Sequence, residues 1–251
     1  MNLLFFAYFI LGISIGSFLN VCIYRIPEGM SIVSPPSRCG TCGHRLSFLD
    51  MIPVLSYLLL GGKCRYCHTH YSARYALVEL VTGLLFTLAG TIFLPSIPLA
   101  LVFILIACLV IITFIDFDHQ IINNRFVILI LVTGVLYTHF YPHQYMDALY
   151  GMLIAGGIMF AIYYLSRGGM GEGDVKLSFA LGAWLGLQGS LLLLLTAFVL
   201  GGFIGVLLLA TGIKGRKDAI PFGPYLCIAA YIVLLYGPHL LYYYWRFFAT
   251  R

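Results

Sequence analysis

Charge is what this sequence has least of. Only 9% of its 251 residues are charged, where about 25% is typical of soluble proteins, and the mean hydropathy is +0.99. So little charge excludes a large soluble domain, a disordered tail and a nucleic-acid-binding surface of the usual basic kind. Hydrophobic residues instead make up 61% of the chain, enough for seven or eight spans of about 20 residues each. The composition predicts an all-α polytopic protein whose first partner is the lipid bilayer.

Apolar runs divide the chain into about eight predicted transmembrane helices. The first run, 1–24, has no basic residue before it and no small-residue cleavage site after it, so it is expected to be a retained span rather than a signal peptide. Further runs lie near residues 76–94, 98–115, 126–141, 147–166, 177–211 and 222–245. The run 177–211 is long enough for two spans, and Gln188, Gly189 and Ser190 mark the expected break between them.

Basic residues gather on one side of this predicted topology. With the N-terminus outside, 12 of the 14 Lys and Arg residues share a side, and only Arg246 and Arg251 lie opposite. The shared side carries Arg25, Arg38, Arg45, Lys63, Arg65, Arg74, Arg125, Arg167, Lys176, Lys214, Arg216 and Lys217. By the positive-inside rule that side is the cytoplasm. The net charge of +5 therefore indicates membrane orientation rather than a polyanionic partner.

The one sizeable polar segment, residues 25–74, contains two Cys-x-x-Cys pairs. Cys39 and Cys42 form the first pair, Cys64 and Cys67 the second, and 21 residues separate them. Four cysteines at this spacing are typical of a tetrahedral structural Zn2+ site, which can hold the shape of a loop too small for its own core. Redox-active cysteines are the alternative, but a cytoplasmic loop disfavours stable disulfides. Three histidines lie close enough to substitute as ligands: His44, His68 and His70.

Two of the nine acidic residues stand where apolar runs are expected to reach the cytoplasmic side. Asp116 follows the run 111–115, and Asp174 follows a glycine-rich stretch at the start of a span, so the two are predicted to lie at the same depth. Such a pair can share one proton, with one carboxyl as base and the other as acid. Aspartic proteases use this arrangement to activate water for attack on an amide carbonyl. The alternative is two ordinary helix-end carboxylates, with Asp174 capping a helix beside Lys176.

Four further residues are candidates for accessory roles. Asp118 follows Asp116 by two residues, so in a helix the two side chains project on nearly opposite faces. Glu79 is one turn into the second span, where facing lipid would cost a few kcal/mol. It is expected to face the bundle interior, and substrate orientation, ion pairing and loop anchoring all stay open. Gly171 and Gly173 lack side chains, so the backbone before Asp174 can approach other groups closely and adopt unusual dihedral angles.

Taken together, these motifs resemble the bifunctional type IV prepilin peptidases. The resemblance covers nearly the whole chain and is carried in order by residues 16–21, 24–27, the two Cys-x-x-Cys pairs, 53–57, 74–79, 115–118, 171–174 and 221–224. One departure is Asn123 followed by Asn124, where the family usually has Pro-Asp. The main alternative is a proton-coupled transporter, because intramembrane carboxylates also mark proton relays, although the sequence shows none of the internal repeats expected there.

The resemblance implies a membrane aspartic endopeptidase of the Gly-x-Gly-Asp type, with Asp116 and Asp174 as catalytic residues. Three domains are expected: a first transmembrane helix (1–24), a cytoplasmic zinc-binding domain (25–74) and a transmembrane aspartic peptidase bundle (75–251). The implied substrates are prepilins or pseudopilins with a short basic leader ending in Gly, cleaved at the cytoplasmic face of a bacterial inner membrane. The resemblance also implies methylation of the new N-terminus with S-adenosyl-L-methionine, for which the sequence assigns no binding residues, and it leaves the oligomeric state open.

Overall fold

The structure is a computed structural model that describes residues 2–93, 95–141, 144–166, 169–215 and 219–249. Over these residues the regular structure is helical, and the extended pairing consists of two isolated bridges in the cysteine-rich segment. The predicted all-α class is confirmed. Four basic residues used in the topology prediction, Arg167, Arg216, Lys217 and Arg251, lie outside the described residues.

Six helices in the described part of the chain are long and apolar enough to cross a membrane. They are α1 (Asn2–Arg25), α3 (Arg74–Ile92), α4 (Ile97–His119), α6 (Tyr145–Ser166), α7 (Glu172–Ala210) and α8 (Gly223–Ala249). The helix α5 (Asn124–His139) is apolar but has only 16 residues, which at 1.5 Å per residue cover about 24 Å. Each of the eight predicted runs corresponds to helix, because α5 is the run near 126–141 and α7 contains the two segments predicted within 177–211.

The helix α7 is interrupted at one residue. Gly186 has φ 65° and ψ −172°, a conformation that glycine adopts readily and other residues rarely. A break within the run 177–211 was predicted, but the predicted position at residues 188–190 is wrong by two residues. Polar Gln188 suggested a connection there, yet the turn needs the backbone freedom of a glycine, and residues 188–190 continue the helix.

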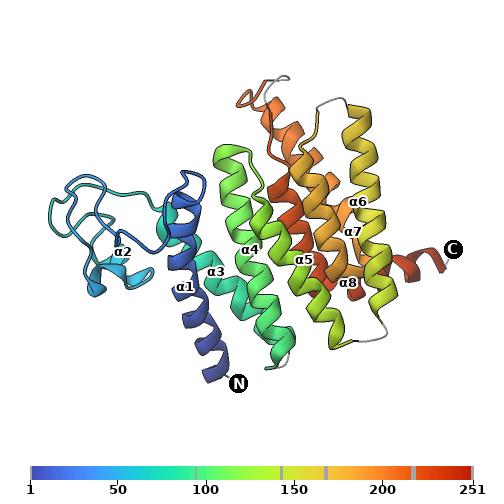
Figure 1. Ribbon diagram of the computed structural model, residues 1–251, viewed down its shortest axis with the longest axis horizontal. Coiled ribbons are helices and arrows are strands. Elements are labelled where there is room, and N and C mark those ends of the chain that lie inside the picture. Colours follow the sequence, from blue (N-terminus) through green and yellow to red (C-terminus); the bar gives the residue numbers. More distant parts are fainter. Residues whose placement is uncertain (1, 94, 142–143, 167–168, 216–218, 250–251) are drawn as a thin grey trace. The chain divides into compact units, whose positions relative to one another are not determined.

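The two parts of α7 run along different partners. The first part packs on α6, where Gly182 meets the backbone of Gly151. The second part runs antiparallel to α8, with Gly189 beside Val233 and Gly201 beside Tyr225. The chain therefore reverses at Gly186. In Figure 1 the gold first part of α7 begins, and its orange second part ends, at the same end of the bundle.

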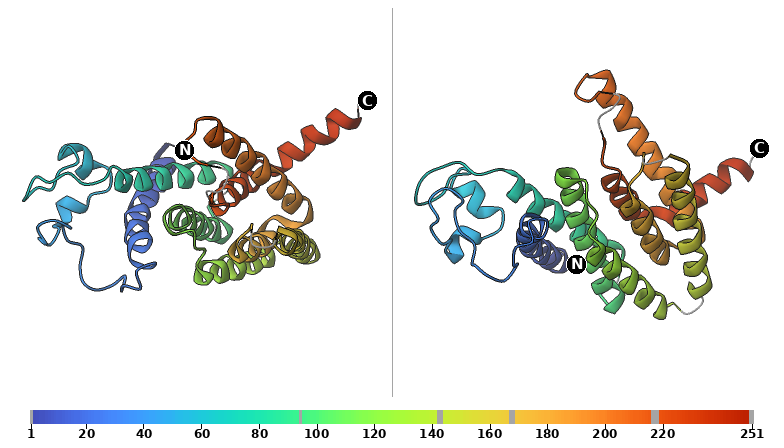
Figure 2. Two further views of the ribbon diagram at one scale, coloured as in Figure 1. Left: turned by 90° about the horizontal axis from the view of Figure 1, so that it is seen from above. Right: turned by 45° about the horizontal axis from the view of Figure 1, so that its top comes forward.

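The chain forms two compact units, Met1–Ile111 and Ile112–Arg251. In the first unit α1 crosses α3 (blue and teal in Figure 2) at closely approaching backbones. A Cβ atom on Gly12 would lie 2.7 Å from the Cα of Gly83, and one on Gly16 would lie 2.8 Å from the Cα of Glu79. Small residues thus permit the close packing on which helix association in a membrane depends.

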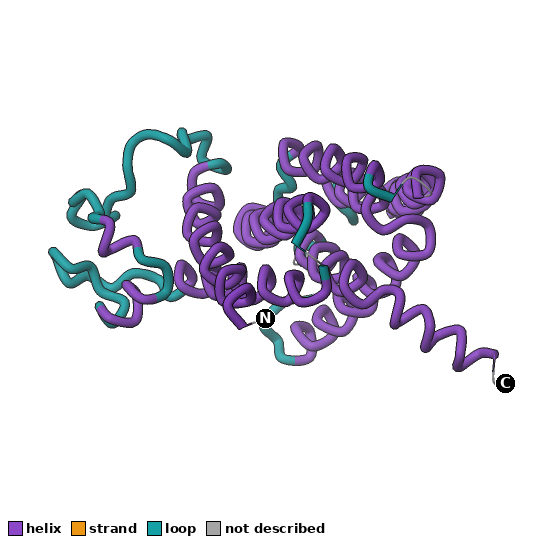
Figure 3. The backbone as a smooth tube through the Cα atoms, turned by 90° about the horizontal axis from the view of Figure 1, so that it is seen from below, coloured by secondary structure: helices purple, strands orange, loops and turns teal. Residues whose placement is uncertain are grey.

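The segment between α1 and α3 differs from every other connection in the described chain by its length. It contains only the short helices η1 (Phe48–Met51) and α2 (Leu55–Leu59), and Figure 3 shows it as long teal loops, whereas the other helices follow one another through short connections. With so little regular structure, this segment needs side-chain contacts or a bound metal to hold its shape.

In the second unit, α5 packs against the first part of α7 through Trp184. The indole Nε1 donates a 2.9 Å hydrogen bond to the carbonyl of Ile130, and the ring stacks on Tyr137 with centroids 4.8 Å apart. Gly134 makes room for the indole, since a Cβ there would lie 2.7 Å from it. These contacts hold the end of the first part of α7, just before Gly186, against α5.

Candidate functional site

The four cysteines of the first unit come together at one point. Their Sγ atoms all lie within 4.8 Å of one another, and those of Cys39 and Cys67 are 3.8 Å apart. Four sulfurs placed tetrahedrally at 2.3 Å from one zinc ion stand about 3.8 Å apart. The donor set and its spacing therefore fit a tetrahedral metal ion.

The two Cys-x-x-Cys pairs adopt the same backbone turn. In each pair the carbonyl of the first cysteine accepts a hydrogen bond from the N–H four residues later, and its own N–H donates to the carbonyl five residues later. The residue that closes the turn is Gly43 in one pair and His68 in the other, with φ 69° and 57°. His68 is thus part of the turn, while His44 stacks on Tyr66 with ring centroids 3.6 Å apart.

The thiols of the cluster differ in acidity. Hydrogen bonding with the hydroxyl and the backbone of Thr69 lowers the pKa of Cys67 to about 6. A hydrogen bond from the backbone of His44 favours the Cys42 thiolate, but partial desolvation by the cluster and the neighbouring thiols outweigh it and raise the pKa of Cys42 to about 11. Thiolates this close repel one another. A cation that binds all four sulfurs must therefore displace protons, and its affinity decreases as the pH is lowered.

Asp50 anchors η1 to the second cysteine turn. Its carboxylate accepts hydrogen bonds from the N–H and hydroxyl of Ser47, from Nε of Arg65 at 2.6 Å and from the hydroxyl of Tyr66 at 3.2 Å. Burial opposes its ionisation, but these bonds together hold the pKa of Asp50 at about 2. Sequence reasoning missed this residue, because its partners lie up to 16 positions away.

Glu79 lies in α3 with only 8% of its surface exposed, and its Oε2 accepts a 2.7 Å hydrogen bond from the backbone N–H of Val54. Val54 precedes α2 and has φ 63°, which is unusual for a β-branched residue. Three roles were left open for Glu79. Its hydrogen bond with Val54 corresponds to the anchoring of the loop.

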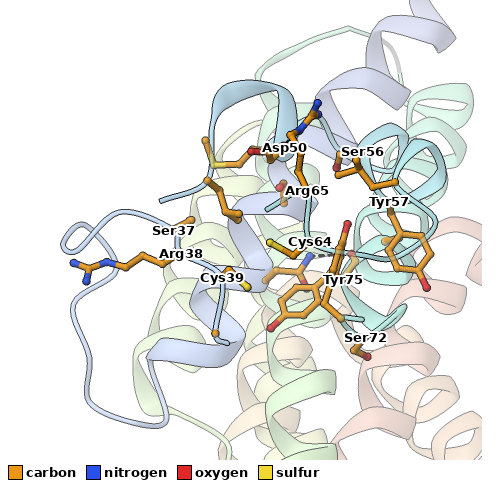
Figure 4. A pocket seen from close by; sticks show the side chains of 18 of the residues that line it. Ser37, Arg38, Cys39, Asp50, Ser56, Tyr57, Cys64, Arg65, Ser72 and Tyr75 are labelled. Carbon is orange, nitrogen blue, oxygen red and sulfur yellow. Dashed lines mark hydrogen bonds and ion pairs between the residues drawn. The ribbon is translucent and has the colours of Figure 1, made fainter. Parts of the chain in front are cut away.

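A pocket of about 880 Å3 opens between α1, the cysteine-rich segment and α3. Tyr57, Tyr75 and Glu79 belong to its wall. Figure 4 shows Tyr75 beside Cys64 and Tyr57 farther from it, with the side chain of Arg38 extending away from the other labelled side chains. The volume falls in the range of sites for ligands of cofactor size.

The structure brings the two predicted carboxylates of the second unit together. Asp116 ends α4 and Asp174 lies in the first turn of α7, and they are only 5% and 7% exposed. Ile122 lies beside both, next to Gly173, which precedes Asp174, and next to Gly223, which contacts Asp116. Asp118 is exposed, so the structure leaves it outside the pair.

Asp116 has a backbone partner that sequence reasoning did not name. The N–H of Gly223 donates a 3.1 Å hydrogen bond to its Oδ2. A Cβ atom at position 223 would lie 2.6 Å from the same oxygen, so only glycine permits this approach. The sequence offered one signal for this contact. Residues 221–224, in which the glycine stands between Phe222 and Pro224, are part of the family resemblance, but no role had been assigned to them.

Asp174 lies in a different environment. Its Oδ1 is buried and has no hydrogen-bond partner among the described residues, and its Oδ2 faces Gly171. Lys176 is paired with exposed Glu172 at 2.9 Å. The N-cap of α7 is Gly171, without a side-chain cap. Asp174 is thus not the N-cap residue, but its carboxyl group lies beside the N-cap residue Gly171 and makes a backbone hydrogen bond with it.

Gly173 lets the start of α7 approach the segment after α4. A Cβ at position 173 would lie 2.9 Å from the Cβ of Ile122, and one at Gly223 would lie 3.2 Å from its Cδ1. Ile122 thus fills the space beside both glycines. Any larger side chain at position 173 has to displace it, which moves the backbone next to Asp174.

Comparison with known proteins returns two family models that together cover most of the chain. Residues 10–93 match the bacterial peptidase A24 N-terminal domain. Residues 103–206 match the type IV leader peptidase family. The first match contains the cysteine cluster and the second contains both aspartates.

Curated relatives match over nearly the whole length. The chain is 35% identical to the prepilin leader peptidase/N-methyltransferase of Aeromonas hydrophila over 91% of this chain and 89% of the relative. It is also 35% identical to the protein of that name from Pseudomonas putida, over 92% of each. A Myxococcus xanthus protein of the same name is 39% identical over 83% of this chain. No solved structure matches the chain.

Proposed function

The chain belongs to the type IV leader peptidase family, and we propose that it removes the leader peptide of type IV prepilins or pseudopilins and methylates the new N-terminus. The family and the names of the relatives identify it as a protease and a methyltransferase. The observation that best supports a peptide-cleaving site is the buried pair of Asp116, in the last turn of α4, and Asp174, in the first turn of α7.

The surroundings of the two carboxyl groups support a division of roles. The N–H of Gly223 stabilises negative charge on Asp116, which suits a general base. The carboxyl group of Asp174 also makes a backbone hydrogen bond, with Gly171, but its buried Oδ1 has no partner among the described residues and can carry the proton. In the proposed step Asp116 takes a proton from water, the water oxygen bonds to the peptide carbonyl carbon, and Asp174 gives its proton to the leaving amine as the C–N bond breaks.

The charge distribution supports cleavage at the cytoplasmic face. In the proposed topology Asp116, Asp174 and the cysteine-rich segment lie on the side rich in Lys and Arg. A substrate with an apolar helix can lie in the bilayer while its leader and scissile bond reach water at that face. Gly171 leaves space beside Asp174, which supports its accessory role next to an extended chain, whereas the space beside Gly173 is filled by Ile122. The compartment that fits is a bacterial inner membrane.

We also propose that Cys39, Cys42, Cys64 and Cys67 bind one structural Zn2+. The sulfur separations and the repeated turns support this assignment. The ion would hold a segment that otherwise has short helices, one ion pair and a few side-chain hydrogen bonds. A structural site with four protein ligands takes no part in the cleavage step.

For methyl transfer the donor would be S-adenosyl-L-methionine, which supplies an activated methyl group. The residues present fit such a molecule in the pocket of about 880 Å3. Tyr57 and Tyr75 offer rings for stacking against a base, and the carboxylate of Glu79 offers a partner for a cationic centre. In this assignment these residues bind and orient the donor, and the amine of the cleaved pilin supplies the electron pair.

The test is co-expression with a prepilin that carries a basic leader, followed by intact mass measurement of the pilin. Wild type is expected to remove the leader and add one methyl group. Asp116→Asn and Asp174→Asn are expected to leave the prepilin uncut, whereas Asp118→Asn, two residues from the site and exposed, serves as the matched control and retains cleavage. Cleavage by either of the first two variants contradicts the proposed pair. If wild type leaves the prepilin untouched, a proton-flux assay in vesicles tests the transporter alternative.

A further inference from the structure

The cysteine-rich segment exposes apolar side chains that a loop in water would not be expected to expose. Within residues 48–59 they project from η1 and α2, and Phe48 and Leu59 are 80% and 83% exposed. The set is Phe48, Leu49, Met51, Leu55, Leu58 and Leu59, here called the 48–59 patch. A contiguous apolar patch rimmed by polar residues marks a surface that meets another apolar phase.

The depth of this patch is set by a hydrogen bond to a membrane span. Val54, in the middle of the segment, donates its N–H to Glu79. Glu79 is the fifth residue after Arg74, the first residue of α3, which places it about 7.5 Å along the helix axis at 1.5 Å per residue. The middle of the patch is therefore held level with the second turn of the span, not above its end. Figure 1 agrees, showing α2 beside α1 rather than beyond it.

Local geometry fixes the segment in this position. Val54 keeps φ 63° and ψ −50° immediately before α2, and in this conformation its N–H reaches Glu79 of α3. The capping box of Ser47 and Asp50 fixes the start of η1, and Asp50 is paired with Arg65. Polar contacts therefore tie the start and the middle of the patch to the protein, and the apolar side chains are left exposed.

We propose that residues 48–59 form an in-plane anchor that inserts the patch into the interfacial layer of the bilayer around α1 and α3. With the start of α3 at the membrane surface, the distance of about 7.5 Å along its axis agrees with the 5–10 Å to which interfacial helices bury their apolar face. Exposed Arg45, Lys63 and Arg65 flank the segment and complement anionic headgroups. A second copy of the chain or the apolar helix of a substrate would need the patch to face them, whereas lipid surrounds the spans at this depth without any further partner.

This anchor goes beyond the proposed activity and does not depend on it. It gives buried Glu79 a mechanical role, because the hydrogen bond to Val54 transmits the position of α3 to the cysteine-rich segment. The segment would then be held at the membrane surface by lipid on one side and by α3 on the other.

The experiment places a tryptophan in the patch of the full-length protein. Leu59→Trp is reconstituted in vesicles of anionic lipid with and without bromine on the acyl chains, and its emission is obtained by subtracting that of wild type, which contains two tryptophans. The matched control is Arg38→Trp, on the same segment but directed away from the other labelled side chains (Figure 4). Phe48→Trp is a second reporter if Leu59→Trp folds poorly.

The proposal expects brominated lipid to quench Leu59→Trp and Phe48→Trp at least twofold more than Arg38→Trp, at every protein-to-lipid ratio. Equal quenching of all three, or none, overturns it. Loss of the quenching of the patch tryptophans by brominated lipid, seen only at high protein density, assigns the patch to a second copy of the chain. Loss of this quenching that appears only after an apolar pilin helix is added assigns it to substrate, and either result also overturns the lipid anchor. The readout contains no activity, so its failure is distinct from failure of the proposed function.

Discussion

Asp147 holds the reversal of α7 from the neighbouring helix. Its carboxylate accepts a 3.0 Å hydrogen bond from the backbone N–H of Leu187, the first residue after the interruption at Gly186. The second part of α7 begins there, so an anionic side chain stands at a helix N-terminus, where it both satisfies a free N–H and opposes the helix dipole. The pair explains how one residue can separate two helical segments without a loop.

Gly186→Ala is expected to be strongly destabilising. A methyl group at this positive φ is strained and would collide with Asp147, and the combined cost is expected to reach about 2–3 kcal/mol or more. Thermal unfolding in detergent measures it. The matched control is Gly157→Ala in α6, where a Cβ would meet nothing within 4 Å. That change should leave stability unchanged or raise it by up to about 1 kcal/mol. Equal melting temperatures of the two variants would contradict the role assigned to Gly186.

Asp147→Ala is expected to cost about 1–2 kcal/mol, because the N–H of Leu187 loses its acceptor. Asp147→Asn keeps an oxygen in place and should cost less. The same unfolding measurement checks both variants. If they are equally destabilised, the carboxylate contributes through charge alone rather than through the hydrogen bond.

Gly173→Leu is expected to abolish leader cleavage while the protein still inserts. The side chain would overlap Ile122 and displace the backbone beside Asp174. Membrane fractionation and pilin mass measure the two outcomes separately. Gly202→Leu, in the second part of α7 with nothing within 4 Å of a Cβ, is the control and should cleave normally. Normal cleavage by Gly173→Leu would refute the steric argument. Gly173→Ala is expected to lower cleavage through the same contact, and the additional change Ile122→Ala is expected to restore part of that activity.

Metal analysis of the purified protein is expected to return one equivalent of zinc. Cys39→Ser and Cys67→Ser should each remove most of it, because three remaining thiolates bind zinc much more weakly than four. Cys108→Ser, buried within α4, should leave the zinc content unchanged. Less than one equivalent in wild type, with full retention in the Cys39 variant, would count against the site.

Asp50→Asn is expected to speed the release of metal to a chelator several-fold at pH 7, because it weakens the ion pair that ties η1 to Arg65. Glu28→Gln, an exposed carboxylate of the same segment, is the control. The pKa of Asp50 is lowered to about 2, so its stabilising effect is complete above about pH 4, where the unfolded chain is also ionised, and is lost as the pH falls toward 2. In metal-free protein the difference in stability between wild type and Asp50→Asn should therefore vanish across that interval.

Much of the candidate site was accessible from the sequence. The positions of Asp116 and Asp174 at the ends of apolar runs predicted their common depth, because span length fixes where a chain leaves the bilayer. The cysteine spacing likewise predicted the cluster, since a Cys-x-x-Cys turn brings two sulfurs together locally. In contrast, the contacts of Gly223 with Asp116 and of Asp147 with Leu187 join residues 107 and 40 positions apart. No local pattern encodes them.

By itself the sequence determined that the chain is a bundle of apolar helices with a cysteine-rich insertion, because hydropathy and short-range spacing depend only on neighbouring residues. Only the tertiary structure decided where α7 reverses, which backbone N–H faces Asp116 and at what depth Glu79 holds Val54. The physical reason is that these are choices among many chemically equivalent donors and acceptors. Helix packing selects one partner for each, and that selection depends on the shape of glycine contacts between helices far apart in the chain.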